Sequence, residues 1–389
     1  MLIQRDLYKE IKPYFNSKES IVITGMRRVG KTTLLNSIYE EIGSDNKLVL
    51  DLENTLNRKY FEEEDYERIR LNLEVLGINF GKTAYLFFDE IQFVKNLPSV
   101  VKYLSDHYEI KFFLTGSGSF YLKNLFSESL AGRKYIFELF PLNFKEFLRL
   151  KGEKIVIPPN PTEISESVFQ TLDRLYDEFL KFGGFPGVVA KDDFQEKKKA
   201  LQDIFSSYFQ LEVVQLGDFR KTSTVRDLML LLMQRAGSRL DIQKLSSELG
   251  VSRPSIYEYL AFLEGTYFIH LIKPFSGNRD VEVRGSEKVY LCDSGLLNHT
   301  AQASEGALFE NNIFQLLRPR GKLHYYQKGK SKEIDFILNG KEAYEVKLRP
   351  SSRDLSSLEK TSKELGIKEF NLISRHYTNL LSTLYGFSL

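Results

Sequence analysis

The sequence has very few of the residues that bind zinc or form disulfides. Cys292 is the only cysteine, so no disulfide can form within the chain. The five histidines are scattered, without an i, i+4 pair or a neighbouring thiol: His107, His270, His299, His324 and His376. Because zinc sites are built from closely spaced cysteines and histidines, we expect no zinc site in this protein.

The sequence also lacks a long apolar run and a strong net charge. Its longest purely apolar stretch, LMLLLM, is far shorter than the roughly 20 residues that cross a bilayer, and the first charged residue is already Arg5. A formal net charge of +2 gives no global signal for nucleic-acid binding. We therefore expect a soluble, cytoplasmic protein without a membrane partner, in which any nucleic-acid surface is local.

The length of 389 residues predicts more than one domain. Single hydrophobic cores stop growing at roughly 250 to 300 residues. With 42% hydrophobic and 27% charged residues, the composition is that of an ordinary globular protein. We expect at least two hydrophobic cores.

The stretch GMRRVGKTTLL, residues 25–35, has the phosphate-loop pattern G-x-x-x-x-G-K-T. The apolar run IVIT precedes it and an amphipathic segment ending at Gly43 follows, so strand, loop and helix come in the order that the motif needs. Backbone N–H groups of such a loop hold phosphates, while a lysine reaches the terminal phosphates and a threonine completes a Mg²⁺ shell. We predict that ATP and Mg²⁺ are bound by Gly25, Arg27, Arg28, Val29, Gly30, Lys31, Thr32 and Thr33.

Two adjacent acids follow an apolar strand farther along the chain. Segments 47–54 and 83–92 are predicted to be buried strands, and the second carries Asp89 and Glu90 after four apolar residues. The carboxyl ends of parallel strands are where an α/β sheet places its ligand crevice. We predict that Asp89 holds Mg²⁺ and that Glu90 orients the attacking water, rather than forming a solvated strand end.

Three further residues each allow two interpretations, either a role at this site or a simpler structural role. The predicted strand at 110–119 ends in small polar residues, where Thr115 or Ser117 would sense the γ-phosphate, although Thr-Gly-Ser is also common turn chemistry. Arg133 would act as a catalytic arginine finger on a neighbouring copy in a homo-oligomer, or as a sensor within its own chain. The alternative for Arg133 is a solvated surface arginine.

The motifs GMRRVGKTTLL, YLFFDEIQ, FFLTGSGS, SLAGR, PLNFKEFL and GGFP together resemble a family of prokaryotic AAA-type ATPases. The resemblance continues to KVYLCDSGLL and to an acidic motif at 335–347. It implies a multidomain α/β protein that hydrolyses ATP on a RecA-like parallel sheet, but it implies no substrate. The implied domains are a P-loop ATPase core (1–145), a helical lid (146–235), a winged helix (236–284) and a C-terminal restriction-endonuclease-like α/β domain (285–389).

The middle of the chain is predicted to be mostly helical. The prolines of VIPPNPTE, within 155–163, predict a flexible connection, and helical patterns flank GGFPG at 183–187. From Asp241 the pattern is helix, turn at Gly250, helix and strand, which is the order of a winged helix. Acidic and basic residues are nearly balanced between 241 and 280, so we favour a protein partner over DNA contact for this region.

The segment 305–318 is predicted to be a helix with one misplaced carboxylate. On a helical wheel Glu310 lies inside the apolar arc formed by Ala307, Phe309, Ile313, Phe314, Leu316 and Leu317. An unpaired buried carboxylate costs several kcal/mol, so Glu310 needs a metal ion, a cationic partner or a raised pKa.

A predicted hairpin downstream carries two further acids and a lysine. Asp335 lies on its first predicted strand, and Glu345 and Lys347 lie on the same face of its second. The order Glu310, Asp335, Glu345-x-Lys347 resembles a restriction-endonuclease-like site, which implies that the three acids bind Mg²⁺ while Lys347 activates water. A strict two-residue turn at Asn339-Gly340 would point Asp335 away from Glu345, so this interpretation requires a three-residue loop or a bulge.

These observations support two functional hypotheses of different classes. The first is a Mg²⁺-dependent ATPase coupled to a nucleic-acid-directed C-terminal domain, a nuclease if the second site cleaves; a local surplus of five positive charges between 318 and 349 suits DNA as its partner. The second is a nucleotide-gated regulator that captures a protein partner, in which the nuclease-like fold binds without cleaving. A solvated, salt-bridged hairpin is the simplest alternative for Asp335, Glu345 and Lys347.

Overall fold

We describe the fold from a computed structural model. It describes residues 4–118, 133–158, 164–217, 219–276, 282, 284–329 and 332–389. Residues 129–132 of the motif SLAGR and most of the predicted proline-rich connection lie outside these ranges. The chain forms two compact units, Met1–Phe140 with Gly265–Tyr267, and Pro141–Glu264 with Phe268–Leu389. The predicted lid, winged helix and C-terminal domain therefore all fall almost wholly within the second unit.

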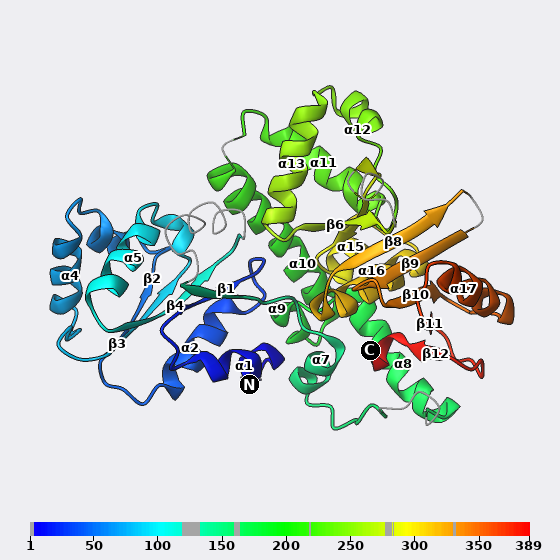
Figure 1. Ribbon diagram of the computed structural model, residues 1–389, viewed down its shortest axis with the longest axis horizontal. Coiled ribbons are helices and arrows are strands. Elements are labelled where there is room, and N and C mark those ends of the chain that lie inside the picture. Colours follow the sequence, from blue (N-terminus) through cyan, green and yellow to red (C-terminus); the bar gives the residue numbers. More distant parts are fainter. Residues whose placement is uncertain are drawn as a thin grey trace. The chain divides into compact units, whose positions relative to one another are not determined.

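The first unit is built on a parallel sheet of five strands in the order β2-β3-β4-β1-β5 (Figure 1). Its strands are β1 (Ser20–Thr24), β2 (Lys47–Asp51), β3 (Ala84–Asp89), β4 (Ile110–Gly116) and β5 (Lys134–Glu138). Its helices are α1 (Asp6–Ile11), α2 (Lys31–Glu41), α3 (Thr55–Arg58), α4 (Tyr66–Val75) and α5 (Leu97–His107). All residues of β1 are buried, as the sequence predicts for a central strand of a parallel sheet.

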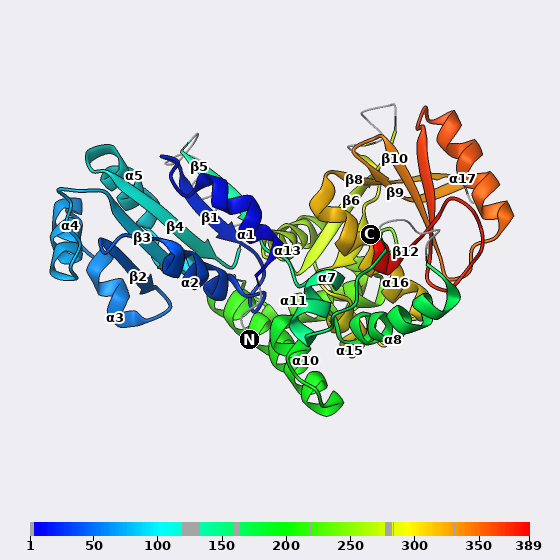
Figure 2. The ribbon, with the colours of Figure 1, turned by 90° about the horizontal axis from the view of Figure 1, so that it is seen from below.

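The two faces of this sheet are covered by different helices (Figure 2). On one face α4 and α5 contribute Ile69, Leu73, Val101 and Leu104 to a core that also contains Leu86, Phe88, Phe112 and Leu114. On the other face α2 packs through Tyr39 against Phe87, with ring centroids 5.2 Å apart. Because strand residues alternate between faces, the apolar run of β3 supplies both cores.

The second unit begins with helices. They are α7 (Phe144–Lys151), α8 (Glu166–Phe182), α9 (Pro186–Val189), α10 (Phe194–Tyr208), α11 (Thr222–Gln234), α12 (Ile242–Leu249) and α13 (Arg253–Gly265). A π-helical segment, Phe209–Leu216, continues α10. Gly250 ends α12 in the left-handed conformation, and Ser252 accepts a hydrogen bond from the Ser255 N–H at the start of α13. The predicted order of helix, turn and helix is confirmed there.

A mixed sheet of seven strands completes the second unit in the order β12-β11-β10-β9-β8-β6-β7. Its strands are β6 (Ile269–Pro274), β7 (Lys288–Leu291), β8 (Leu323–Lys328), β9 (Lys332–Leu338), β10 (Glu342–Lys347), β11 (Glu369–Ser374) and β12 (Thr383–Tyr385). Its helices are α15 (Ser294–Ala301), α16 (Glu305–Leu317) and α17 (Ser352–Glu364). Phe314 of α16 stacks on Tyr290 of β7, and Leu358 of α17 packs in a cluster with Ile334 of β9.

Buried Asp293 fixes the start of α15 to the GGFP segment. Its carboxylate accepts hydrogen bonds from the backbone N–H groups of Gly184, at 2.7 Å, and Leu296, at 2.9 Å. Gly183 has a φ of +74°, and a Cβ there would lie 2.0 Å from Asp293 Oδ1, so only glycine fits. This contact explains why GGFP and KVYLCDSGLL, far apart in the sequence, are parts of one structure.

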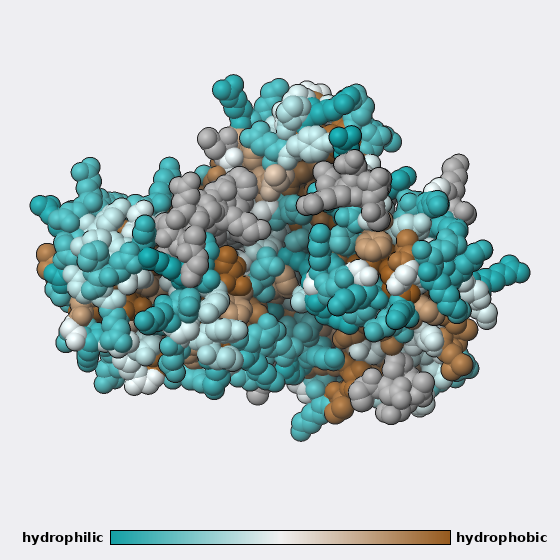
Figure 3. All heavy atoms as spheres, in the orientation of Figure 1, coloured by the Kyte–Doolittle hydropathy of each residue, from teal (hydrophilic) through white to brown (hydrophobic). Residues whose placement is uncertain are grey.

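Among the residues that the structure describes, no helix is both long and apolar enough to cross a bilayer. On the face drawn in Figure 3, apolar residues are scattered among hydrophilic ones.

Candidate functional site

The loop between β1 and α2 is held in place by two glycines. Gly25 has a φ of +153°, and a Cβ on it would lie 2.1 Å from the carbonyl oxygen of Leu139. Gly30 has a φ of +99° and precedes the first residue of α2. Val29 between them is fully buried. The loop can follow this path only because both positions lack a side chain.

Lys31, the first residue of α2, is folded inward. Its side chain is only 3% exposed, and Nζ donates hydrogen bonds to the carbonyl oxygens of Gly25, at 3.1 Å, and Met26, at 3.2 Å. Nζ also lies 3.5 Å from Glu90 Oε1. The lysine ammonium therefore lies inside the loop, facing the acid that follows β3.

Thr32 and Asp89 lie side by side at the carboxyl end of the sheet. The Thr32 hydroxyl donates a 2.6 Å hydrogen bond to Asp89 Oδ2, and the Thr115 hydroxyl of β4 donates to Asp89 Oδ1. Burial raises the pKa of Asp89, although the two hydroxyl groups oppose that shift. A hydroxyl and a carboxylate in contact are ligands that Mg²⁺ accepts, so the donor set fits the predicted metal.

Glu90 has a left-handed backbone, with φ +53°, directly after the strand. Its carboxylate accepts a 2.5 Å hydrogen bond from Gln92 Nε2, which also donates to Ser117 Oγ at 2.9 Å. Burial opposes ionisation of Glu90, but Lys31 and Arg27 outweigh it and lower the pKa of this carboxyl group. The carboxyl group of Glu90 is therefore ionised at neutral pH.

The other residues predicted to bind the nucleotide differ in exposure and in contacts. Arg27 is half-buried, with Nη1 3.5 Å from Glu53 Oε2. Arg28 is exposed and has a left-handed φ of +69°. Thr33 is exposed in the first turn of α2. Ser117 reaches Glu90 through Gln92, whereas Thr115 contacts Asp89 itself.

Tyr267 is a residue of this unit that the sequence did not suggest. It has a left-handed φ of +64° and is 3% exposed. Its hydroxyl lies 2.5 Å from Thr24 Oγ1 and donates to Glu138 Oε1 at 2.8 Å. Since Thr24 directly precedes Gly25, Tyr267 supports the base of the loop. No local pattern marks it, because its partner is 243 positions away.

Arg133 lies at the amino end of the parallel strands, opposite the end where the loop lies. Its carbonyl oxygen accepts a hydrogen bond from the N–H of Ser20, the first residue of β1, whereas the loop follows the last residue of that strand. Its exposed guanidinium forms an ion pair with Asp106 of α5. The structure therefore does not bring Arg133 to the loop of its own chain, and an action on a neighbouring copy stays a prediction.

The hairpin of the second unit has the irregular form that the nuclease hypothesis requires. Leu338 pairs with Glu342, which leaves the three residues 339–341 as the loop. Asn339 and Gly340 both have positive φ, 52° and 69°. Continuing this register places Asp335 opposite Glu345, so the two acids share one face. Of the two forms that this hypothesis allows, a three-residue loop or a bulge, the structure has the three-residue loop.

The acids of this hairpin are buried close to two lysines. Lys347 Nζ lies 2.7 Å from Glu345 Oε1, while Glu345 Oε2 is buried without a hydrogen-bond partner. Burial and the neighbouring Asp335 raise the pKa of Glu345 to about 8. Burial also raises the pKa of Asp335, and Lys288 and Lys347 oppose that shift.

Glu310 points from α16 towards the same group. Its carboxylate accepts a 2.7 Å hydrogen bond from the Tyr290 hydroxyl and lies 3.7 Å from Lys288 Nζ. Burial and the charge of Asp335 raise the pKa of Glu310 to about 7. Of the three alternatives for this carboxylate, the structure thus shows a cationic partner and a raised pKa. We define the acidic cluster as Glu310, Glu333, Asp335 and Glu345.

Lys288 and Glu333 were missed by sequence reasoning. Lys288 Nζ lies 2.9 Å from Glu333 Oε1 and 3.8 Å from Asp335 Oδ1, in addition to Glu310. The acidic cluster has the oxygen chemistry that Mg²⁺ prefers. Its arrangement does not fit the ion, because an ammonium group occupies its centre and no three acidic, histidine or cysteine side chains of the described chain are placed to hold a metal.

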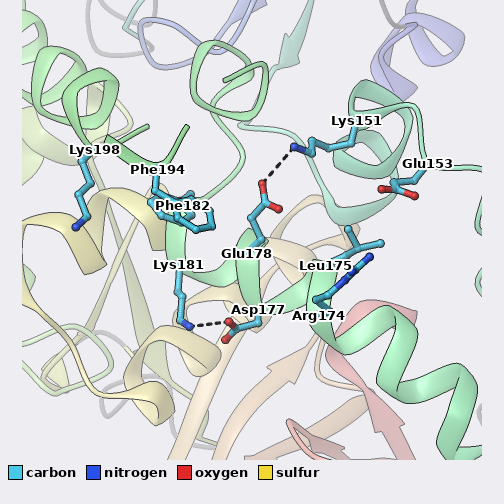
Figure 4. Close-up of a pocket in the computed structure, with 10 residues that line it drawn as sticks. All are labelled: Lys151, Glu153, Arg174, Leu175, Asp177, Glu178, Lys181, Phe182, Phe194 and Lys198. Atoms are coloured by element: carbon cyan, nitrogen blue, oxygen red, sulfur yellow. Dashed lines mark hydrogen bonds and ion pairs between the residues drawn. The ribbon is translucent and has the colours of Figure 1, made fainter. Parts of the chain in front are cut away.

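A separate pocket of about 610 Å³ lies beside α8 (Figure 4). Two ion pairs join residues that line it: Lys181 Nζ lies 2.6 Å from Asp177, and Lys151 Nζ lies 3.5 Å from Glu178. Cations and acids nearly balance around it, and none of the predicted site residues lines it. It is therefore distinct from both candidate sites.

Three protein-family models match parts of the chain. Residues 17–148 match an AAA domain family, residues 173–306 a domain of unknown function, DUF8612, and residues 305–381 another, DUF4143. The chain is 31% identical to the "uncharacterized protein MJ1544" of Methanocaldococcus jannaschii over 95% of this chain and 84% of that protein. It is 28% identical to an uncharacterized protein of Haemophilus influenzae over 86% of this chain and 84% of that protein.

A solved structure with similarity to the chain is a Walker-type ATPase of Pyrococcus abyssi. The TM-score is 0.48 at 14% sequence identity, and the match covers 77% of this chain and 96% of that one.

Proposed function

Because the chain belongs to the family of the Methanocaldococcus jannaschii protein MJ1544 and carries an AAA domain at residues 17–148, we propose that it binds ATP with Mg²⁺ and hydrolyses the nucleotide at the β1–α2 loop. The observation that carries this proposal is the convergence of Lys31, Thr32, Asp89 and Glu90 at the carboxyl end of the sheet.

Each residue has a role that its contacts support. The loop N–H groups and the Lys31 ammonium bind the β- and γ-phosphates, since they place positive charge inside the loop. Thr32 and Asp89 would hold Mg²⁺, which would neutralise charge on the phosphates. Glu90 orients water for attack, and Gln92 and Ser117 keep its carboxylate in place.

Substitution of Lys31 tests this proposal. We expect Lys31→Ala to abolish ATP turnover and to weaken nucleotide binding, because it removes the buried ammonium from the loop. Lys95→Ala, which changes an exposed lysine of the same unit, serves as the control. Turnover in Lys31→Ala equal to that of the wild type would refute the ATPase assignment.

We further propose that the second unit contains a helical lid, a winged helix and a nuclease-like domain directed at nucleic acid. Two observations support it: Asp335, Glu345 and Lys347 meet at one face of the irregular hairpin, and residues 318–349 carry a surplus of five positive charges. Once the Lys288 ammonium has left the carboxylates, plasmid DNA, single-stranded DNA and RNA should be cleaved with Mg²⁺ or Mn²⁺, and the rate should depend on ATP. Intact substrates under all of these conditions would contradict a general nuclease.

The alternative is a nucleotide-gated regulator that binds a protein partner without cutting nucleic acid. Two observations favour it: the near-balanced charge of 241–280, and the Lys288 ammonium inside the acidic cluster. Thermal melting distinguishes the two. A cleaving site predicts that DNA with metal stabilises the wild type but not a variant with Asp335→Ala and Glu345→Ala. A regulator predicts the same absence of stabilisation in both proteins.

A further inference from the structure

Lys288 is the most deeply buried cation of the acidic cluster. Its side chain is 5% exposed, compared with 38% for Lys347. Nζ lies 2.9 Å from Glu333, 3.7 Å from Glu310 and 3.8 Å from Asp335. One ammonium group thus contacts carboxylates from both α16 and β9.

The remaining acid of the cluster has its own lysine. Glu345 pairs with Lys347 at 2.7 Å, and its second oxygen is buried without a hydrogen-bond partner. Lys288 and Lys347 together offset half of the four negative charges that the cluster would carry if fully ionised. A divalent ion at the same carboxylates would lie a few ångströms from the Lys288 ammonium and would be repelled by it.

The backbone of Lys288 belongs to strands outside the acid-bearing hairpin. It is the first residue of β7, where it pairs with Ile272 of β6, and it forms a bridge with Arg239 after α11. The ammonium can therefore leave the carboxylates through a change in its own rotamer or in β7, while β9 and β10 keep their register. The lysine lies on β7, whereas the acids lie on α16, β9 and β10.

We infer that Lys288 is the resident cation of the acidic cluster and that it keeps divalent metal ions out until its ammonium group withdraws. This inference builds on the proposed C-terminal site. It assigns to Lys288 a positioning role, because the lysine acts through the carboxylates. The carboxylates of the cluster are of the kind that binds Mg²⁺, but the Lys288 ammonium excludes the ion while it lies among them.

The test is binding of Mn²⁺ to the full-length chain, followed by the electron paramagnetic resonance signal of free Mn²⁺ and by thermal melting. We expect Lys288→Met to bind Mn²⁺ at least tenfold more tightly than the wild type and to gain thermal stability on adding it. Adding Asp335→Ala and Glu345→Ala should remove that gain. Lys332→Met is the matched control, because Lys332 also lies on this sheet but pairs with Glu364 instead.

Lys288→Gln, which removes the charge but keeps polar hydrogen-bonding groups, covers the case in which the methionine variant does not fold. Mn²⁺ affinity in the folded variant equal to or below that of the wild type overturns the inference. Tighter Mn²⁺ binding without cleavage of any nucleic acid supports the inference and contradicts only the nuclease proposal. An equal gain in Mn²⁺ affinity in Lys332→Met would also overturn the inference, because the gain would then come from the loss of one positive charge and not from the position of Lys288.

Discussion

The hydroxyl of Thr32 donates a 2.6 Å hydrogen bond to Asp89 Oδ2, across 57 positions of sequence. This contact joins the first turn of α2 to the carboxyl end of β3. In the proposed site, the hydroxyl and the carboxylate would both serve as ligands of one Mg²⁺ ion.

Loss of the Thr32 hydroxyl should weaken the Mg²⁺ dependence of the ATPase. We expect Thr32→Val to raise the Mg²⁺ concentration needed for half-maximal ATP turnover by about tenfold, which is about 1.4 kcal/mol. The reason is that the metal loses one oxygen ligand and Asp89 loses a hydrogen bond. A magnesium titration of the turnover rate measures this. Thr32→Ser should behave like the wild type, and an identical titration curve for Thr32→Val would contradict the assignment of Thr32.

A side chain at Gly25 should displace the loop. Its Cβ would lie 2.1 Å from Leu139 O, a backbone atom that cannot move aside alone. We expect Gly25→Ala to lose at least tenfold in nucleotide affinity and about 1 to 3 kcal/mol of stability. Nucleotide titration and thermal unfolding measure the two effects. In Gly43→Ala the new Cβ meets nothing within 4 Å, so this control should match the wild type.

Asp293 should make the stability of the protein depend on pH. Burial raises the pKa of this carboxyl group from 3.8 to about 6. A raised native pKa contributes stability that is fully present below the unfolded pKa and is lost as pH rises through the native one, here between about pH 4 and pH 6.

The comparison with Asp293→Ser isolates this effect, because serine can still cap α15 but does not titrate there. We expect the difference in unfolding free energy between wild type and variant to shrink by about 2 kcal/mol from pH 4 to pH 7. Chemical denaturation at several pH values provides the measurement. A difference that stays constant over this range would show that Asp293 has an ordinary pKa.

Short, contiguous sequence patterns were enough to predict the phosphate loop and the strands and helix beside it. The strand, glycine loop and lysine of residues 21–31 and the acids at the carboxyl end of β3 lie where they were expected, because spacing and apolar runs determine them locally. The AAA-type character of this region is confirmed by the match at residues 17–148.

Contacts between distant residues were not accessible from the sequence. Lys288 meets Glu333 across 45 positions, and Tyr267 meets Thr24 across 243. Neither residue stands in a recognisable motif, since an isolated lysine on a short strand and a tyrosine after a helix are common. The hairpin register was left with two alternatives, and only the pairing of Leu338 with Glu342 decided between them.

The central claim is that Glu90 activates water at a nucleotide held by the β1–α2 loop, and a parallel assay of ATP binding and ATP hydrolysis in Glu90→Gln tests it most directly. We expect the variant to bind ATP with Mg²⁺ as the wild type does and to hydrolyse it about 100-fold more slowly or worse. Glu109 is an exposed acid at the amino end of β4, so the control variant Glu109→Gln should hydrolyse ATP at the wild-type rate. Hydrolysis by Glu90→Gln at the wild-type rate would contradict the account.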